Sequence, residues 1–495
     1  MQKRVYQLKY IIVTFITVLA FDAYTQPIVR LSLKEAIGLA QKNSLDYKIA
    51  KNMAKSSYWN FQAYKSDFLP KLSLNGSIPN YYRTINLITL PTGENDFVSQ
   101  NVANSSLNLN LSQNIGLTGG RISMSSSLQR IDNFGQFDNT SYNSVPFSLS
   151  YFQNNLFYNE FKWQKKIQPL RLLEAQREYL ENLESISYLT TNKYFDLLSA
   201  QQQIKLDQQN LKNIDTLVKI TQARFEIGTV QLNNVLQSKV SLLNAKQAVA
   251  NSTLALETAK QNFMRFLNLN KSEDMELQLP DSVIFFTINP TLALEKAKSN
   301  RKFIVEFQRR RLEAEQAIAK TKSETGPTLN IRANLGLTQT GNSFNQTYAD
   351  LLRNQSVTLA FYIPLLDWGV NRSNRKRAEA NLELENNNIE QMEVSAEQEI
   401  YYQTMKWSMQ KEQMLISREA SSLAQQRYDI SKQKYTVGSL SYTDFNNAQL
   451  DKDRAITDYM INLRNYWALY YLIRRLTLFD FESNKNIEFT DLAFD

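Results

Sequence analysis

Two long stretches of the chain lack glycine and proline and carry apolar residues seven positions apart. The absence of helix breakers predicts a long helix over each stretch. The apolar series are Leu183, Leu197, Ile204, Leu211, Val218 and Phe225 in the first stretch, and Ile400, Trp407, Met414, Tyr428 and Tyr435 in the second. A seven-residue period indicates left-handed supercoiling against neighbouring helices. A helix from Leu170 to Glu226 would reach about 85 Å, so it must lie in a coiled coil, a long bundle or a tube.

Each stretch ends at a glycine, Gly228 or Gly438, and a second helical pattern follows at once. This arrangement predicts two helical hairpins with tight tips. The return helices are expected over 230–269 and 441–478.

The period changes from seven to two where most of the other glycines and prolines gather. Alternating apolar and polar residues predict strands at about 70–80, 145–153, 327–338 and 355–364. Their length, about ten residues, suits a transmembrane β-strand. A soluble sheet shows the same alternation, but an interfacial girdle of aromatic side chains near strand ends favours a membrane barrel. The aromatic residues concerned are Tyr81, Tyr82, Tyr348, Trp163 and Trp368.

The segment 81–144 has alternating stretches of its own, around Leu109 and around Ile122, joined by Thr118, Gly119 and Gly120. It is either an extracellular elaboration or an added pair of barrel strands. We favour the extracellular elaboration at this point.

The chain is an internal repeat. A shift of 257 residues places Pro70 on Pro327, and a shift of 210 places Gly228 on Gly438. The predicted organisation is a first repeat over 26–280, with a long helix over 160–227, a second repeat over 281–479, with a long helix over 370–437, and a tail over 480–495. Four strands in one chain cannot close a membrane barrel, since the smallest has eight. Three chains would give twelve strands, with the long helices forming a shared tube below.

The N-terminus has the pattern of a secretory signal peptide over residues 1–25. Lys3, Arg4 and Lys9 precede an apolar run over 10–21, and small residues follow at 23–25. A run of twelve is too short to span a bilayer, so the alternative is a buried helix. The mature chain would be exported, and it would lack the N-terminal cysteine of a lipoprotein.

Composition removes several classes of protein. The 495 residues include no cysteine and no histidine, which excludes thiol nucleophiles, Ser-His-Asp triads and Cys/His zinc sites. The formal charge of +8 is spread along the chain and indicates a solvated surface rather than a nucleic-acid site. Glu379 and Glu383 stand at helical spacing, but on a charged face. We expect no catalysis, cofactor or metal.

Taken together, the motifs resemble the TolC family of outer-membrane efflux proteins. The resemblance covers nearly all of the mature chain and rests on order, duplication and spacing. Its carriers are Leu33–Ile37 with Ala40 and Asn43, Phe68-Leu69-Pro70, the segment 362–369, and the tip motifs 224–228 and 434–438. The resemblance implies a homotrimeric channel-tunnel, mainly α, with a 12-stranded barrel of four strands per chain in the outer membrane and a coiled α-helical tunnel in the periplasm.

The resemblance also implies function and partners. The protein would be the passive exit duct of a tripartite efflux or type I secretion system. A periplasmic adaptor (membrane fusion protein) would dock at the tips, at Gly228, Thr229, Val230, Gly438, Ser439 and Leu440. An inner-membrane transporter would supply the energy. The cargo, small molecules or polypeptides, is left open.

Five positions correspond to the family's gate near the tips. Tyr435 and Asp444 keep the family's residues, and three copies of Asp444 around one axis would attract cations. The positions of further gate groups hold Asn447, Asn234 and Leu440, so the closed state must use other links. Asp444 also suits a helix N-cap after the tip.

Four other classes of protein fit less well. A periplasmic coiled-coil adaptor would have one hairpin rather than two copies of a strand-and-hairpin unit. A porin would be β throughout. A secreted enzyme and a nucleic-acid binder are disfavoured by composition and by the signal sequence.

Overall fold

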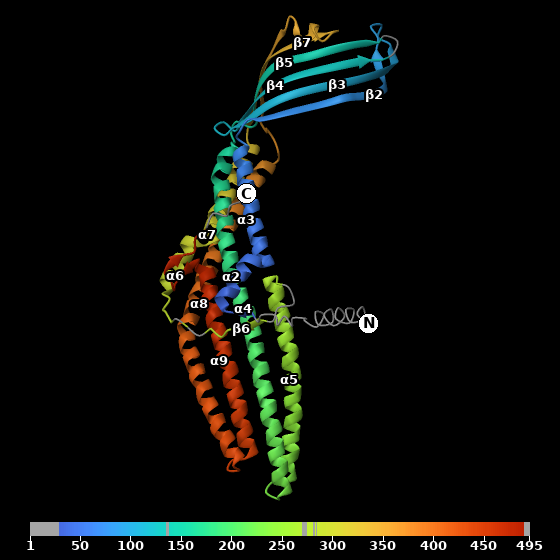
Figure 1. The fold of residues 1–495 in the computed structure, drawn as a ribbon. Helices are drawn as coiled ribbons and strands as arrows, with labels where there is room; N and C mark the ends of the chain where they lie inside the picture. The colour runs from blue at the N-terminus through green and yellow to red at the C-terminus, as the bar shows by residue number, and fades with distance from the viewer. Residues whose placement is uncertain (1–28, 135–137, 270–274, 281–282, 284, 490–495) are drawn as a thin grey trace, which may run out of the picture.

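The computed structural model describes residues 29–134, 138–269, 275–280, 283 and 285–489. The chain is elongated, with a curved sheet at one end and two helical hairpin tips at the other (Figure 1). This arrangement confirms the expectation of a mainly α chain with a large sheet at one end. The predicted signal sequence lies outside the described residues. Among those described, no helix combines the length and the apolar composition needed to cross a membrane.

Two helices of equal length form the shaft. They are α4 (Glu160–Glu226) and α8 (Val370–Thr436), each of 67 residues, and they are offset by 210 positions. At 1.5 Å per residue each spans about 100 Å. The return helices α5 (Leu232–Leu267) and α9 (Tyr442–Thr477) have 36 residues each and the same offset. Helix α4 packs against both α5 and α9, and α9 packs against α8, so the lateral order is α5, α4, α9, α8.

The apolar seam of α8 is buried at all five predicted positions, from Ile400 to Tyr435. The seam of α4 is not. Leu197 and Ile204 are buried, but Phe225 is 37% exposed, and the buried row lower down is Asn210, Ile214, Leu217 and Thr221. A straight helix drifts about 20° per heptad against a seven-residue repeat. Over the six heptads from Leu183 to Phe225 this drift would move the buried row about one residue toward the C-terminus, whereas Asn210 and Leu217 lie one residue toward the N-terminus of the series. The packing of Leu217 against Tyr428, Tyr435 and Phe445 of the second hairpin therefore sets the row.

Shorter elements surround the shaft from its middle to the end that carries the sheet (Figure 1). The helices are α2 (Leu33–Asn43), α3 (Leu45–Ser66), α6 (Pro290–Asn300) and α7 (Lys302–Glu324). The short strands are β1 (Val29–Leu31), β6 (Met275–Leu277), β9 (Phe479–Asp480) and β10 (Lys485–Asn486), with β1 parallel to β6. The main core lies here, where the rings of Trp407 and Tyr466 are 4.9 Å apart and those of Trp407 and Phe286 are 5.0 Å apart.

Arg474 forms two ion pairs beside this core. The guanidinium of Arg474 on α9 donates from Nε to Glu184 Oε2 (3.0 Å) and from Nη2 to Oε1 (3.1 Å). Its Nη1 donates to Asp480 Oδ2 at 3.0 Å. Glu184 is only 3% exposed. Burial raises the pKa of Glu184, against the opposing effect of Arg474.

The sheet holds six strands where we expected four. Its order is β2-β3-β4-β5-β7-β8, antiparallel throughout. The strands are β2 (Lys71–Thr89), β3 (Asn95–Ile115), β4 (Gly120–Asn133), β5 (Asn139–Gln153), β7 (Thr328–Gly341) and β8 (Leu352–Tyr362). A 3₁₀ turn, η1 (Gln346–Tyr348), lies between β7 and β8. The extra strands β3 and β4 come from the segment 81–144, which we had favoured as an extracellular elaboration.

Candidate functional site

The two hairpin tips have the same backbone geometry. Gly228 and Gly438 are left-handed, with φ of +76° and +86°. After each glycine the next amide donates back into the helix, Thr229 N to Arg224 O and Ser439 N to Lys434 O, both at 2.9 Å. This is the Schellman ending, in which glycine adopts a conformation that a side chain would strain. The duplicated glycines therefore fix both tips as sharp turns.

Arg224 joins the two hairpins just above their tips. Its Nη2 donates to the carbonyl oxygens of Thr436 (2.9 Å) and Tyr435 (3.3 Å), the last carbonyls of α8. The guanidinium carbon also lies 5.7 Å from the centre of the Tyr435 ring. A cation at a helix C-terminus is favourable because it meets the negative end of the helix dipole. Arg224 therefore caps a helix of the other repeat.

Tyr435 belongs to an aromatic cluster between α4, α8 and α9. Its hydroxyl lies 3.0 Å from that of Thr221 on α4. Its ring stacks on Phe445 at 5.4 Å and meets the ring of Tyr442 edge-on at 6.1 Å. Tyr428 and Leu217 complete the buried cluster. The cluster locks the lower ends of α4 and α8 together within one chain.

A buried lysine lies next to this aromatic cluster, on the side away from the tips. Lys452 is 3% exposed, and its Nζ is 3.0 Å from Asp453 Oδ1 and 4.4 Å from the centre of the Tyr428 ring. Asn210 of α4 donates to Asp453 Oδ2 at 2.8 Å. Burial raises the pKa of Tyr428 to about 12, so its hydroxyl stays neutral and accepts a hydrogen bond from Asn213 Nδ2 at 2.9 Å.

The expected gate residues separate into two groups. Tyr435, Leu440 and Asn234 line one groove between the tips, with a volume of about 460 Å³. Asp444 and Asn447 are exposed and lie outside its lining. Tyr435 bonds to Thr221 rather than to Asn234. Gly228 and Gly438, which we expect to contact an adaptor, stand at the two tips, as the hairpin pattern predicts.

Asp444 is not the N-cap of α9 that its position after the tip suggested. The residue that caps α9 is Ser441, whose hydroxyl accepts from the amide of Asp444 at 3.1 Å. The same hydroxyl donates to Asp444 Oδ2 at 2.6 Å. Asp444 is thus the third residue after the N-cap, and both its amide and its carboxylate bond to the hydroxyl of Ser441. Its second carboxylate oxygen is left for solvent or for other groups.

The sequence did not indicate the roles of three of these residues, Thr221, Arg224 and Lys452. Arg224 belongs to a tip motif, but a surface arginine is common near any helix end. Its contact with the other hairpin could therefore not be distinguished from an ordinary exposed position. Thr221 and Lys452 gave no signal, because their burial depends on how α4, α8 and α9 pack together near the tips. Asn210 and Thr221 in the buried row are polar, and a search for apolar periodicity passes over them.

Apolar side chains form exposed rows on the two outermost helices. Those on α5 are Leu232, Leu236, Val240, Leu243 and Leu254. Those on α8 are seven residues apart: Tyr402, Met409, Ile416, Leu423 and Ile430. Such rows are coiled-coil seams that lack a partner helix within the chain. In the part of the chain that the structure describes, no acidic cluster is arranged to hold a metal ion.

We expect Arg224→Ala to loosen the second tip. The change removes two hydrogen bonds from a charged donor to the end of α8, a loss of roughly 1.5 kcal/mol at a partly exposed site. Amide hydrogen exchange at Gly438 and Ser439 should become faster. Lys434→Ala is the matched control, because Lys434 is the exposed equivalent of Arg224 in the other repeat. Equal exchange rates in the two variants would show that Arg224 does not hold the tip.

The comparisons with known proteins agree with this architecture. The family model described as "Outer membrane efflux protein" matches residues 36–269 and 293–463. No curated protein matches the chain.

Among solved structures, the chain is similar to the CmeC outer membrane channel of Campylobacter jejuni, with a TM-score of 0.65, 16% identity, and coverage of 90% of this chain and 85% of that one. It is similar to VceC of Vibrio cholerae, with a TM-score of 0.63, 14% identity and coverage of 92% and 97%. It is also similar to the open state of the MtrE channel of Neisseria gonorrhoeae, with a TM-score of 0.61, 14% identity and coverage of 90% and 88%.

The structural likenesses show the shared fold, and the family match covers most of the chain in both repeats. Together they confirm the resemblance found in the sequence. The chain belongs to the outer membrane efflux protein family.

Proposed function

We propose that this protein is the outer-membrane exit duct of a tripartite export system. One observation carries the proposal: a sheet with an exposed apolar face stands at one end of a shaft of about 100 Å, and two paired hairpin tips stand at the other. Such a molecule can sit in the outer membrane and reach far into the periplasm. The family is one of channels rather than of enzymes.

The channel would be a homotrimer. Strand β8 and strand β2 are the two edges of the sheet, and every residue of both is exposed. Open edges in lipid leave unpaired backbone groups, each at a cost of several kcal/mol. The apolar rows of α5 and α8 lie on the lateral edges of the shaft. In a ring of three chains, α8 of one chain would pack on α5 of the next, and each β8 would pair with a neighbouring β2.

The tips are the proposed docking surface for a periplasmic adaptor. The groove between them is open and mixes apolar residues such as Val230, Val437 and Leu440 with polar groups such as Gln237. A helical hairpin with apolar anchors would suit such a groove. An inner-membrane transporter would drive the cargo, because the duct has no energy source of its own. Both small molecules and polypeptides remain candidate cargoes.

The tips would also form the gate. The bonds of Arg224 and Tyr435 tie α4 to α8 within each chain, so the closed state is held by links inside the protomers at this level. Opening the tunnel would require these helices to separate. Residues Asn234 and Leu440, which depart from the family's pattern, line the same groove. The proposed closed state therefore uses an Arg–carbonyl cap and a Tyr–Thr bond.

The mass of the particle in mild detergent tests the proposal. We expect a trimer that restores drug or metabolite tolerance to cells lacking the gene. Ile416→Asp should break the row on α8, because it places a charge in the proposed contact, whereas Ile416→Val keeps the row apolar. A monomeric wild-type particle would refute the proposal, and so would normal assembly and export by Ile416→Asp.

Asp444→Asn should lower the cation preference of the pore. Three carboxylates around one axis attract cations, and the amide removes three charges while it can still accept from Ser441. The measurement is the reversal potential across a planar bilayer under a salt gradient, with Asp444→Glu as the charge-retaining control. An unchanged reversal potential in Asp444→Asn would leave Asp444 with only its capping role.

A further inference from the structure

We propose that the trimer of this protein closes an eighteen-stranded barrel, with six strands from each chain, and that β3 and β4 are full members of the membrane wall. This inference rests on the proposed trimeric duct. It gives the duct a wider outer-membrane passage than a wall of four strands per chain would.

The β3–β4 hairpin starts at the level where the sheet meets the helices. The side chain of Gln113 donates to Phe68 O (3.2 Å), and that of Asn114 donates to Asp67 O (2.9 Å), just beyond α3. On the other side, Asn159 Nδ2 donates to the carbonyl of Gly116 at 3.0 Å while its oxygen caps α4. The β3–β4 turn is therefore fastened between the C-terminal end of α3 and the N-terminal end of α4.

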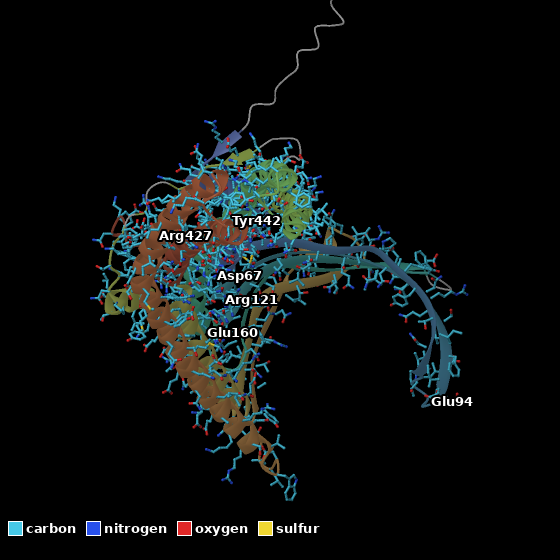
Figure 2. All side chains as sticks on the ribbon, turned by 90° about the horizontal axis from the view of Figure 1, so that it is seen from below. Asp67, Glu94, Arg121, Glu160, Arg427 and Tyr442 are labelled. Carbon is cyan, nitrogen blue, oxygen red and sulfur yellow. The ribbon has the colours of Figure 1, made fainter. Side chains whose placement is uncertain are left out.

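Figure 2 shows this junction from below, with Asp67, Arg121 and Glu160 near the helices and Glu94 at the far end of the β2–β3 hairpin. The connection between β3 and β4 is short, from Ile115 to Gly120, as is typical of the periplasmic turns of membrane barrels. Gly119 needs its φ of +85°, and a Cβ on Gly120 would lie 2.6 Å from Gln153 Oε1. The turn is built to fit the junction, unlike a free surface loop.

The apolar face of the sheet continues through β3 and β4 without a gap. Leu74 of β2 lies opposite Leu109, and Leu72 lies opposite Leu111. Leu111 lies opposite Met124 of β4, which in turn lies opposite Leu149 of β5. Leu149 continues to Leu335 of β7. Leu111 is half-buried, and the other side chains of this row are exposed, so the row presents an apolar band to the surroundings.

The opposite face is polar in the same strands. Ser73 lies opposite Asn110, Asn110 opposite Ser125, and Ser125 opposite Ser148. The hydroxyl of Ser148 then donates to Asn334 Oδ1 at 2.7 Å. An extracellular elaboration in water needs no apolar face that is in register with its neighbours. Strands between lipid and a water-filled lumen do need one.

The two edge strands of the sheet, β2 and β8, run in the directions that an eighteen-stranded barrel of three chains requires. Strand β2 runs away from the shaft and β8 runs back toward it, so β8 of one chain meets β2 of the next antiparallel. Six strands per chain keep the total even, as in single-chain bacterial barrels. Because barrel diameter grows roughly linearly with strand number, eighteen strands give about 1.5 times the diameter of twelve. The size limit on the cargo would then lie at the tips and not in the outer membrane.

Single cysteines provide the test, because the natural chain has none. Met124→Cys and Ser125→Cys place a fluorophore on either face of β4. Leu335→Cys and Asn334→Cys do the same on β7 and serve as controls. In vesicles that contain doxyl-labelled phospholipid, we expect loss of fluorescence at 124 equal to that at 335, and little loss at 125 or 334. Electron microscopy of the same trimers should count eighteen strands in the wall.

Two other outcomes are distinguishable. If position 335 is quenched by lipid but position 124 is reached only by an aqueous quencher, and the wall has twelve strands, the hairpin lies outside the barrel; the inference is overturned and the duct stands. If position 335 is not quenched either, or the particle is not a trimer, the proposed duct itself fails.

Discussion

Ile204→Pro should abolish export. Ile204 lies in the middle of α4, is 8% exposed and belongs to the seam that packs this helix against its neighbours. Proline removes the hydrogen bond to the carbonyl four residues earlier and clashes with it, at a cost of about 3 kcal/mol or more. The kink would displace the 22 residues between position 204 and the end of α4 at Glu226, and with them Arg224 and Thr221. The contacts of the proposed gate and the groove proposed for docking would then be lost.

Ile204→Leu is the matched control, because a swap of equal volume in a core costs under about 1.5 kcal/mol. The measurement is drug or metabolite tolerance in cells that carry each variant, with the amount of protein in the outer membrane checked in parallel. Wild-type tolerance in Ile204→Pro would argue against a continuous helical tunnel. Loss of tolerance in both variants would point to a packing defect that is not specific to the helix.

The shaft was predictable because its signals are local. The stretches without helix breakers lie within α4 and α8, although α4 starts before Pro169, and Gly228 and Gly438 mark the tips by a backbone conformation that other residues avoid. The buried row of lower α4 was not predictable from the seven-residue series. Its position depends on the packing of Leu217 against Tyr428, Tyr435 and Phe445 of the second hairpin, which is a contact between residues far apart in the chain.

The sheet was predictable in kind but not in size. Strand β4 alternates around Ile122 and Met124, but Ser126 and Arg130 stand on its apolar face and weaken the pattern. Whether such a stretch joins the wall depends on pairings 13 to 31 residues apart along the chain, such as Leu111 with Met124 and Val102 with Asn133. Likewise, the Tyr435–Thr221 bond joins residues 214 positions apart, and no local pattern in the sequence reports it.

Arg474→Ala should destabilise the middle of the shaft by about 3–5 kcal/mol. Arg474 is the one cation that meets both Glu184 and Asp480 among the ion pairs of the described residues. Its loss leaves a carboxylate at Glu184 that is 3% exposed and has no cation beside it. Glu184→Ala should cost less, since Arg474 then keeps Asp480 at 3.0 Å. Replacing both residues with apolar ones, Glu184→Leu with Arg474→Met, should cost less than Arg474→Ala alone, because the carboxylate left without a cation is then only that of Asp480, which is 19% exposed and accepts from the hydroxyl of Tyr470.

The pH dependence separates the two single variants. Burial raises the pKa of Glu184 even with Arg474 in place, and without Arg474 this pKa must rise further. An acid with a higher pKa in the folded state than in the unfolded state gains stability as the pH falls through the interval between the two values. Arg474→Ala should therefore regain stability on acidification from about pH 8 to about pH 5, as Glu184 takes up a proton. Glu184→Ala should not, because the guanidinium that it leaves behind stays charged throughout this range. Thermal unfolding in detergent at both pH values measures the difference. A parallel response of the two variants would mean that Glu184 is not the group that carries the uncompensated charge.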